Sequence, residues 1–167
     1  MPVLPILKYP DPRLHTVARP VTRFDDGLRE LVRDLAETMY DASGIGLAAT
    51  QVDLHRRVLV VDVSESRDQL MVIVNPVLVE GVGESELDEG CLSLPGIYER
   101  VSRFDRVVIR AQDANGESRD IAAAGLFSVC LQHEMDHLEG RVFVEYLSRL
   151  KQSRITAKLN KQSRRVR

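Results

Sequence analysis

Two histidines and a glutamate lie within five consecutive residues, the HExxH segment at 133–137. The surrounding run at 125–138 is largely apolar, and if it is a helix, residues four apart share one face. His133 and His137 can then hold one divalent metal ion, and Glu134 can take a proton from a water beside it and pass it on. The pattern indicates a metal hydrolase, although a helix with two surface histidines and an ordinary glutamate matches it too.

Two imidazoles do not complete a catalytic metal site, which commonly has three protein ligands and an open position for water. Glu139 and Glu145 follow the pair, and neither is clearly placed to bind. Upstream, Cys91 lies between Gly90 and Pro95, so a constrained, non-helical backbone would hold a thiolate that suits borderline divalent metals. The alternative for Cys91 is a buried structural thiol, which is the more common state of a free cysteine.

A second cysteine allows a site of another class. Cys130 precedes His133 by three residues and can lie near the same helix face. Cys91, Cys130 and the two histidines could form a closed structural zinc site in a protein that is not an enzyme. That alternative leaves Glu134 and Gln51 without a role.

Two carboxylates adjoin the candidate ligands. Glu89 lies two residues before Cys91, and Asp136 lies just before His137. Each could orient an imidazole or pair with an arginine such as Arg103. Each could equally be a plain surface carboxylate.

Length and composition indicate one globular protein. The chain has 167 residues, of which 44% are hydrophobic and 29% charged, and we expect one catalytic domain over 1–167 with a basic tail from about 150 to 167. The net charge of −2 predicts no attraction to DNA over the whole molecule. Prolines interrupt the N-terminus, and no apolar run is long enough to span a bilayer. We therefore expect a cytoplasmic protein with free thiols and no membrane partner, and we expect a monomer, although no pattern specifies the oligomeric state.

Periodicity and turn signals predict an α+β fold. Mostly antiparallel strands would pack around a central HExxH helix, with one helix near the N-terminus and one at the C-terminus. Gly44, just past the first helix, would suit a left-handed cap. The predicted elements are helices at 25–40, 125–138 and from 150 to 159, strands at 58–63, 70–75, 77–82, 101–103, 106–112 and 117–121, a loop at 84–90, and a strand or turn at 141–146.

Three segments in this order and spacing resemble the three motifs of the peptide deformylase family. They are GIGLAATQ at 44–51, EGCLSLP at 89–95 and QHEMDH at 132–137. The segment PDPRL at 10–14 is also similar to that family, so the resemblance covers most of the chain.

The resemblance implies a metal-dependent hydrolase that removes the formyl group from the N-terminal formyl-methionine of nascent polypeptides and releases formate. The metal, typically Fe(II), with Ni, Co or Zn as substitutes, would be bound by Cys91, His133 and His137. Glu134 would be the general base and acid. The side-chain amide of Gln51 and the backbone N–H of Leu92 would hold the oxyanion.

Four further residues could bind the peptide. Gly46 permits close approach of another backbone, and extended pairing around Ile45 would align it. Leu126 and Val129 lie two turns and one turn before His133, so they could line an apolar pocket for the methionine side chain.

The C-terminus is strongly basic. From Lys151 onward the chain has seven lysines and arginines and no acidic residue, while Ile155 and Leu159 could dock its start. A frayed, solvated end is the simpler interpretation. Localised positive charge also indicates a phosphate backbone as partner. Since the resemblance implies a C-terminal helix that contacts the ribosome near the exit tunnel, we expect a ribosome contact here.

Overall fold

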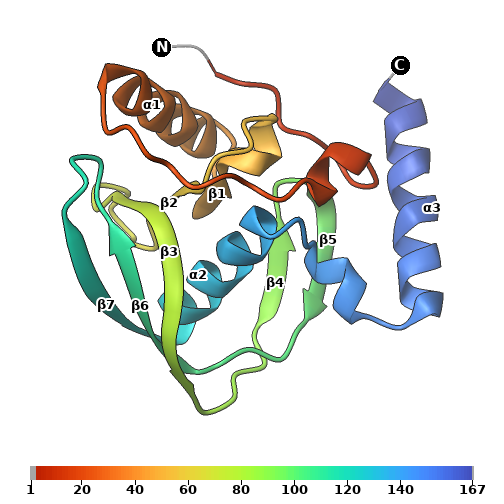
Figure 1. Cartoon of the computed structure of the whole chain (residues 1–167). Helices are drawn as coiled ribbons and strands as arrows, with labels where there is room; N and C mark the ends of the chain where they lie inside the picture. The colour runs from red at the N-terminus through yellow and green to blue at the C-terminus, as the bar shows by residue number, and fades with distance from the viewer. Residues whose placement is uncertain (1–2, 167) are drawn as a thin grey trace.

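The helix α2 (Gly125–Leu138) runs through the middle of the protein (Figure 1). The computed structural model describes residues 3–166, with side chains to residue 164. The other elements are η1 (Pro12–His15), α1 (Asp26–Asp41), β1 (Gly46–Ala48), η2 (Ala49–Val52), β2 (Val58–Val61), β3 (Met71–Val82), β4 (Asp88–Cys91), β5 (Leu94–Arg100), β6 (Arg106–Gln112), β7 (Ser118–Ala124), η3 (Phe143–Tyr146) and α3 (Arg149–Val166).

Two antiparallel sheets surround α2. One has five strands in the order β1-β2-β3-β6-β7, and the other has the two strands β4 and β5 (Figure 1). Apolar residues of α2, among them Leu131 and Leu138, pack against Leu59, Ile73 and Ile109 of the larger sheet. The predicted α+β fold, with antiparallel strands around the HExxH helix and a helix toward each end of the chain, is confirmed.

Helix α1 covers the other side of β1 and β2. Leu28, Leu35 and Met39 recur at helical spacing and are fully buried, so the helix forms within one residue of its predicted ends. The carboxylate of Asp25 accepts a hydrogen bond from the Leu28 N–H at 3.1 Å and caps the first turn. This apolar face fixes the position of β1, which leads into the candidate site.

The turn from α1 to β1 differs from the prediction. Ser43, with φ of 56°, holds the left-handed conformation that was expected at Gly44. Gly44 is needed for space instead, because a Cβ atom there would lie 2.6 Å from Cδ1 of Leu92. The segment before β1 therefore packs closely against the turn that carries Leu92.

Strand β3 is continuous, whereas the sequence predicted separate strands at 70–75 and 77–82. Its pairing with β6 shifts register between Val74 and Val77. Asn75 takes φ of 52° at this point, and its side-chain amide donates hydrogen bonds to a neighbouring segment and to β6. These bonds bridge the irregularity, so one strand continues through it. The strand predicted at 58–63 is β2, and it pairs antiparallel with β3.

Strands β4 and β5 form a hairpin where the sequence predicted a loop at 84–90. Asp88–Cys91 pairs with Leu94–Arg100, and Leu92 and Ser93 make the turn. Cys91 is consequently the last residue of a strand. The strand predicted at 101–103 is wrong, because this segment forms only one isolated bridge.

The chain after α2 forms η3 and α3. Residues 141–146, expected to be a strand or turn, contain the 3₁₀ turn η3. Ile155 and Leu159 of α3 are buried beside Leu94 and Ile97 of β5, which confirms the expected docking (Figure 1). Of the basic tail expected to run to residue 167, the last residue lies outside the described part of the chain.

Candidate active site

Three side chains with metal-binding atoms converge beside α2. Cys91 comes from the end of β4, and His133 and His137 lie four residues apart on one helix face. Sγ of Cys91 is 3.4 Å from Nε2 of His137, which is 3.2 Å from Nε2 of His133. The three ligand atoms all lie within 4.8 Å of one another. A thiolate with two imidazoles suits a divalent transition metal and leaves a coordination position open.

The surroundings of these ligands also fit a metal ion. His137 is fully buried, and His133 is only 7% exposed. Burial, and then the neighbouring His133, lowers the pKa of His137 well below its ordinary value, so its imidazole is neutral and can donate a lone pair. Beside them, Oε1 of Glu134 is buried with no hydrogen-bond partner among the described residues. A buried oxygen without a hydrogen-bond partner indicates that another group or a water molecule binds at the site.

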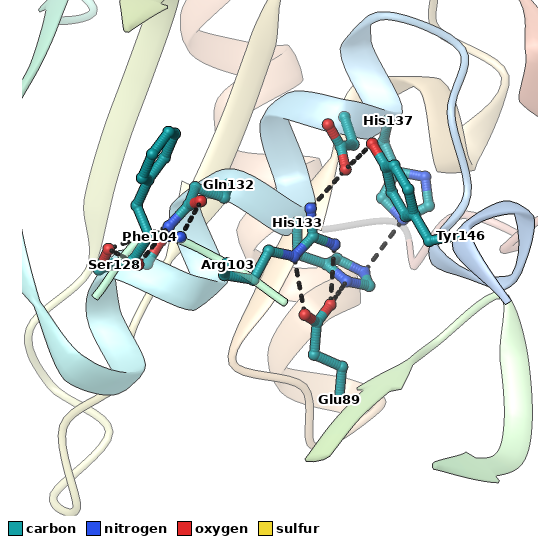
Figure 2. Close-up of polar contacts among 9 residues, drawn as sticks. Glu89, Arg103, Phe104, Ser128, Gln132, His133, His137 and Tyr146 are labelled. Atoms are coloured by element: carbon teal, nitrogen blue, oxygen red, sulfur yellow. Dashed lines mark hydrogen bonds and ion pairs between the residues drawn. The ribbon is translucent and has the colours of Figure 1, made fainter. Parts of the chain in front are cut away.

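Side chains behind the candidate metal ligands hold the imidazole of His133 in place. Oε1 of Glu89 lies 2.8 Å from Nδ1 of His133, which leaves Nε2 for a metal (Figure 2). The guanidinium of Arg103 donates two hydrogen bonds to the Glu89 carboxylate, at 2.8 and 3.0 Å. Burial raises the pKa of Glu89, but the bonds from His133 and Arg103 outweigh it and lower the pKa below its ordinary value. Glu89 is therefore an anion held against the imidazole.

Arg103 also pairs with a second carboxylate. Its Nη1 donates to Asp136 at 2.6 Å, and the hydroxyl of Tyr146 donates to the same carboxylate at 3.0 Å. The guanidinium also lies over the Tyr146 ring, 5.4 Å from its centroid (Figure 2). Glu89 and Asp136 thus both pair with Arg103, which was one of the alternatives predicted for each carboxylate.

The surroundings of Glu134 would allow its carboxylate to accept and donate a proton. Its carboxylate is 3% exposed, and burial raises its pKa to about 7. A pKa near neutrality suits a group that must first accept and later donate a proton. Gly46 gives it room, because a Cβ atom there would lie 2.5 Å from Oε2 of Glu134.

Gln51 presents an oriented amide on the other side of the cluster. Its Oε1 accepts a hydrogen bond from the Ala48 N–H at 3.0 Å, which assigns Nε2 to the opposite direction. Nε2 donates to Oγ of Ser93 at 3.1 Å and lies 3.6 Å from Sγ of Cys91. An N–H donor beside the ligands can stabilise a negative oxygen that forms there. Leu92, the other expected donor, belongs to the adjoining turn.

A cavity of about 560 Å³ opens onto these groups. Its lining includes Gln51, Cys91, Leu92, His133 and Glu134, together with all four residues expected to bind the peptide, which are Ile45, Gly46, Leu126 and Val129. Val129 is 3% exposed and forms a deep wall, whereas Leu126 at 48% and Ile45 at 38% lie at the rim. The space suits an apolar side chain with a short stretch of extended backbone.

Cys130 is not part of the metal-binding group. Among the described residues, that group consists of Cys91 and the two histidines. Sγ of Cys130 faces the Ile45 carbonyl at 3.8 Å, and burial raises the pKa of the thiol well above its ordinary value. The alternative of a closed site with two cysteines and two histidines is therefore not favoured, and Cys130 is a buried residue of the cavity wall.

The sequence missed three polar residues around the site. Ser93 contacts Gln51 from within the motif at 89–95, in which only Glu89, Cys91 and Leu92 were assigned roles from the sequence. Tyr146 contacts Asp136, and Lys8 contacts Leu92. No periodicity links either residue to the motifs, so only their packing reveals them. Glu139 and Glu145, the alternative ligands, instead pair with Arg57 and His15 at the surface.

The family model described as Polypeptide deformylase matches residues 3–153. A protein of Ralstonia nicotianae named Peptide deformylase 1 is 61% identical over 162 residues, which are 96% of each chain. A peptide deformylase of Chromobacterium violaceum is 56% identical over 98% of both chains.

Solved structures of the same family have the same fold. The crystal structure of a peptide deformylase from Legionella pneumophila is similar with a TM-score of 0.94 and 44% identity, over 98% of this chain and 96% of that one. The enzyme from Ehrlichia chaffeensis in complex with actinonin also gives a TM-score of 0.94, at 40% identity, over 98% and 99% of the two chains.

Proposed function

The chain belongs to the polypeptide deformylase family, and we propose that Glu134, Gln51 and Leu92 are the groups that perform its reaction. That reaction is the hydrolytic removal of the N-formyl group from nascent polypeptides, with release of formate. The observation that carries this assignment is a buried carboxylate oxygen, Oε1 of Glu134, which has no hydrogen-bond partner within residues 3–164 and lies beside three convergent side chains that could bind a metal.

We propose that the ligands are Cys91, His133 and His137. A divalent ion held there supplies Lewis-acid activation of water and of the formyl carbonyl. The mixed sulfur and nitrogen donor set supports Fe(II) as the ion used in the cell, with Ni, Co or Zn able to replace it. Iron next to an accessible thiolate is sensitive to oxygen, so handling in air would lower activity.

Glu134 moves the protons in this scheme. In its anionic form it accepts a proton from the water that attacks the formyl carbon. It then donates that proton to the amide nitrogen as the C–N bond breaks, which leaves a free amino terminus and formic acid, and the acid loses its remaining proton to solvent to give formate. Its burial keeps bulk water from competing for the proton.

Two N–H donors stabilise the negative charge that develops on the formyl oxygen. The Gln51 amide is oriented by the Ala48 N–H, and the backbone N–H of Leu92 lies in the turn after the metal-binding cysteine. Donors that are already oriented cost little reorganisation in the transition state, which is why such pockets contribute strongly to rate.

The cavity wall supports binding of formyl-methionine. Val129 and Leu126 offer apolar surface for the methionine side chain, and the backbone at Ile45 and Gly46 offers an edge for the extended peptide. A formyl group has no methyl substituent, so a crowded site of this kind discriminates against acetylated peptides.

We also propose that residues 1–167 act as one catalytic domain and that the enzyme is a cytoplasmic monomer. Among the helices of the described residues, none combines the length and apolarity needed to cross a bilayer. The basic helix α3 supports a contact with the ribosome near the exit tunnel, where formylated chains emerge.

The test is formate release from a formyl-Met peptide by protein purified without oxygen, together with metal analysis. Glu134→Gln should retain the metal and lose activity by about 10²-fold or more. Glu37→Ala, a change at an exposed glutamate of α1, is the control and should behave as wild type. Full activity after complete removal of metal, or normal rates in Glu134→Gln, would refute the assignment.

A further inference from the structure

Residues 7–9 tie together the two segments that carry the proposed oxyanion donors. The Leu7 N–H donates to the Gln51 carbonyl at 2.7 Å, and the Tyr9 N–H donates to the Ser93 carbonyl at 2.9 Å. In Figure 1 this N-terminal stretch, drawn in red, passes from the side of α1 toward β5. One short extended segment therefore holds both sides of the oxyanion pocket.

Apolar packing keeps this segment in place. Leu7 is 9% exposed, and Leu14, which follows in η1, is fully buried. Both belong to the apolar cluster that contains Leu94 and Ile97 of β5. Since the segment is packed against the same hairpin that it hydrogen-bonds, its position relative to the turn is well determined.

Lys8 lies between these two anchored residues and points its ammonium group at the site. Nζ of Lys8 donates to the Leu92 carbonyl at 3.0 Å, and the side chain lines the cavity. Among residues 3–164, no carboxylate forms an ion pair with it. Partial burial lowers the pKa of Lys8, while the neighbouring Cys91 raises it. The ammonium group of Lys8 is thus held at the turn between β4 and β5.

The bond from Lys8 acts on the central peptide of the turn between β4 and β5. That peptide joins Leu92 to Ser93, and its rotation would move Ser93. Oγ of Ser93 is the acceptor for Nε2 of Gln51 at 3.1 Å. A change in this peptide would therefore disturb the turn that presents the Leu92 N–H and the partner that positions the Gln51 amide.

We propose that Lys8 is a positioning residue for the oxyanion pocket. Its ammonium group holds the Leu92 carbonyl and so keeps the Leu92 N–H and the Gln51 amide aimed at one point. It also adds a positive charge to the lining of the cavity in which the formyl oxygen becomes negative, and no carboxylate within residues 3–164 forms an ion pair with it. This inference rests on the proposed function of the site.

The experiment compares Lys8→Gln, Lys8→Met and Lys8→Arg on a formyl-Met peptide. We expect kcat to fall on the order of tenfold in the Gln and Met variants, less than the roughly 10²–10³-fold seen when a direct oxyanion donor is removed. KM should change less than twofold, because the ground-state substrate does not need the donors as strongly. Lys8→Arg keeps a cationic donor and should retain most of kcat.

A measurement that does not depend on turnover complements the kinetics. In amide NMR spectra the signals of residues 92–94 should shift in Lys8→Gln and remain at their wild-type positions in the matched control Lys151→Gln. Lys151 is also an exposed lysine, and its ammonium group makes one polar contact, to Glu99 at 3.3 Å on the surface. Metal content and melting temperature should be unchanged in every variant.

Several results would overturn the inference. They are a wild-type kcat in the Gln and Met variants, a loss confined to KM, or an arginine variant as impaired as the glutamine one. Failure of the proposed function would look different, because wild-type protein would then release no formate. If Lys8→Gln does not fold, the Met and Arg variants decide the question by the same comparison.

Discussion

Oε1 of Glu89 lies 2.8 Å from Nδ1 of His133, and both groups are almost completely buried. The contact joins β4 to α2, so the strand that carries the proposed thiolate ligand also orients one of the proposed imidazole ligands. Arg103 closes the arrangement by binding the Glu89 carboxylate and Asp136 at once. The proposed metal ligands are consequently oriented by a network that joins β4, α2 and the segment between β5 and β6.

The first prediction concerns this network. Glu89→Gln should weaken metal affinity by about 10- to 100-fold, because the imidazole loses the anion that orients it and raises its basicity. A competition titration with a chelator measures the effect. Glu99→Gln, which removes a surface partner of Lys151, should leave affinity unchanged. Equal affinity in both variants would show that Glu89 has no such role.

Arg103→Met gives the second prediction. It would leave the buried carboxylates of Glu89 and Asp136 without their cation, and losing one partner of a buried ion pair typically costs about 3–5 kcal/mol. We expect a large fall in the free energy of unfolding, measured by denaturant titration. Arg100→Met, at an arginine whose ion pair is exposed, should cost under about 1 kcal/mol. Similar values for the two variants would contradict the network.

The third prediction concerns space at Gly46. Gly46→Ala should strongly reduce kcat, because the new Cβ would meet Oε2 of Glu134 at 2.5 Å and Sγ of Cys130 at 2.8 Å. Gly27→Ala in α1 is the control, since its nearest neighbour is a side-chain oxygen at 3.3 Å. Steady-state kinetics with a formyl peptide measure both. A wild-type kcat in Gly46→Ala would mean that the Glu134 carboxylate can move away from this position without loss of activity.

The fourth prediction concerns acid stability. Burial raises the pKa of Asp62, but hydrogen bonds from Ser64 and Tyr40 outweigh it and bring the pKa to about 2. A lowered folded-state pKa stabilises the protein above the unfolded value near 3.9, and this contribution is lost as pH falls from about 4 to about 2. Asp62→Asn should therefore be less stable at neutral pH and lose less stability over that range. Melting curves from pH 2 to 6 test it, with Asp41→Asn at an exposed position as control.

The fifth prediction concerns α3. Truncation from residue 158 would remove the buried Leu159, so substitution of exposed charges is the cleaner test. We expect two results for a triple variant with the changes Arg154→Gln, Lys161→Gln and Arg164→Gln. It should hydrolyse a short formyl peptide as wild type does, and it should co-sediment less with ribosomes, most visibly at low salt. The control carries Gln at three exposed arginines elsewhere, which are Arg23, Arg33 and Arg119. Equal co-sedimentation of the two triple variants would leave α3 as a solvated end.

Local pattern alone determined a large part of the molecule. The apolar periodicity of α1 and α2 predicted both helices closely, and the spacing of His133, Glu134 and His137 on one helix follows from 3.6 residues per turn. The strands predicted at 106–112 and 117–121 correspond closely to β6 and β7, which pair antiparallel. These features depend on neighbours within a few residues, so they can be predicted from the local sequence.

Tertiary structure decided the rest. Strand β4 is acidic and glycine-containing, and it is a strand only because β5 pairs with it. The convergence of Cys91 on His137, the contact of Tyr146 with Asp136, and the reach of Lys8 to Leu92 join residues that no local pattern connects. Such contacts depend on how three apolar clusters pack together, and packing is a property of the whole chain rather than of any segment.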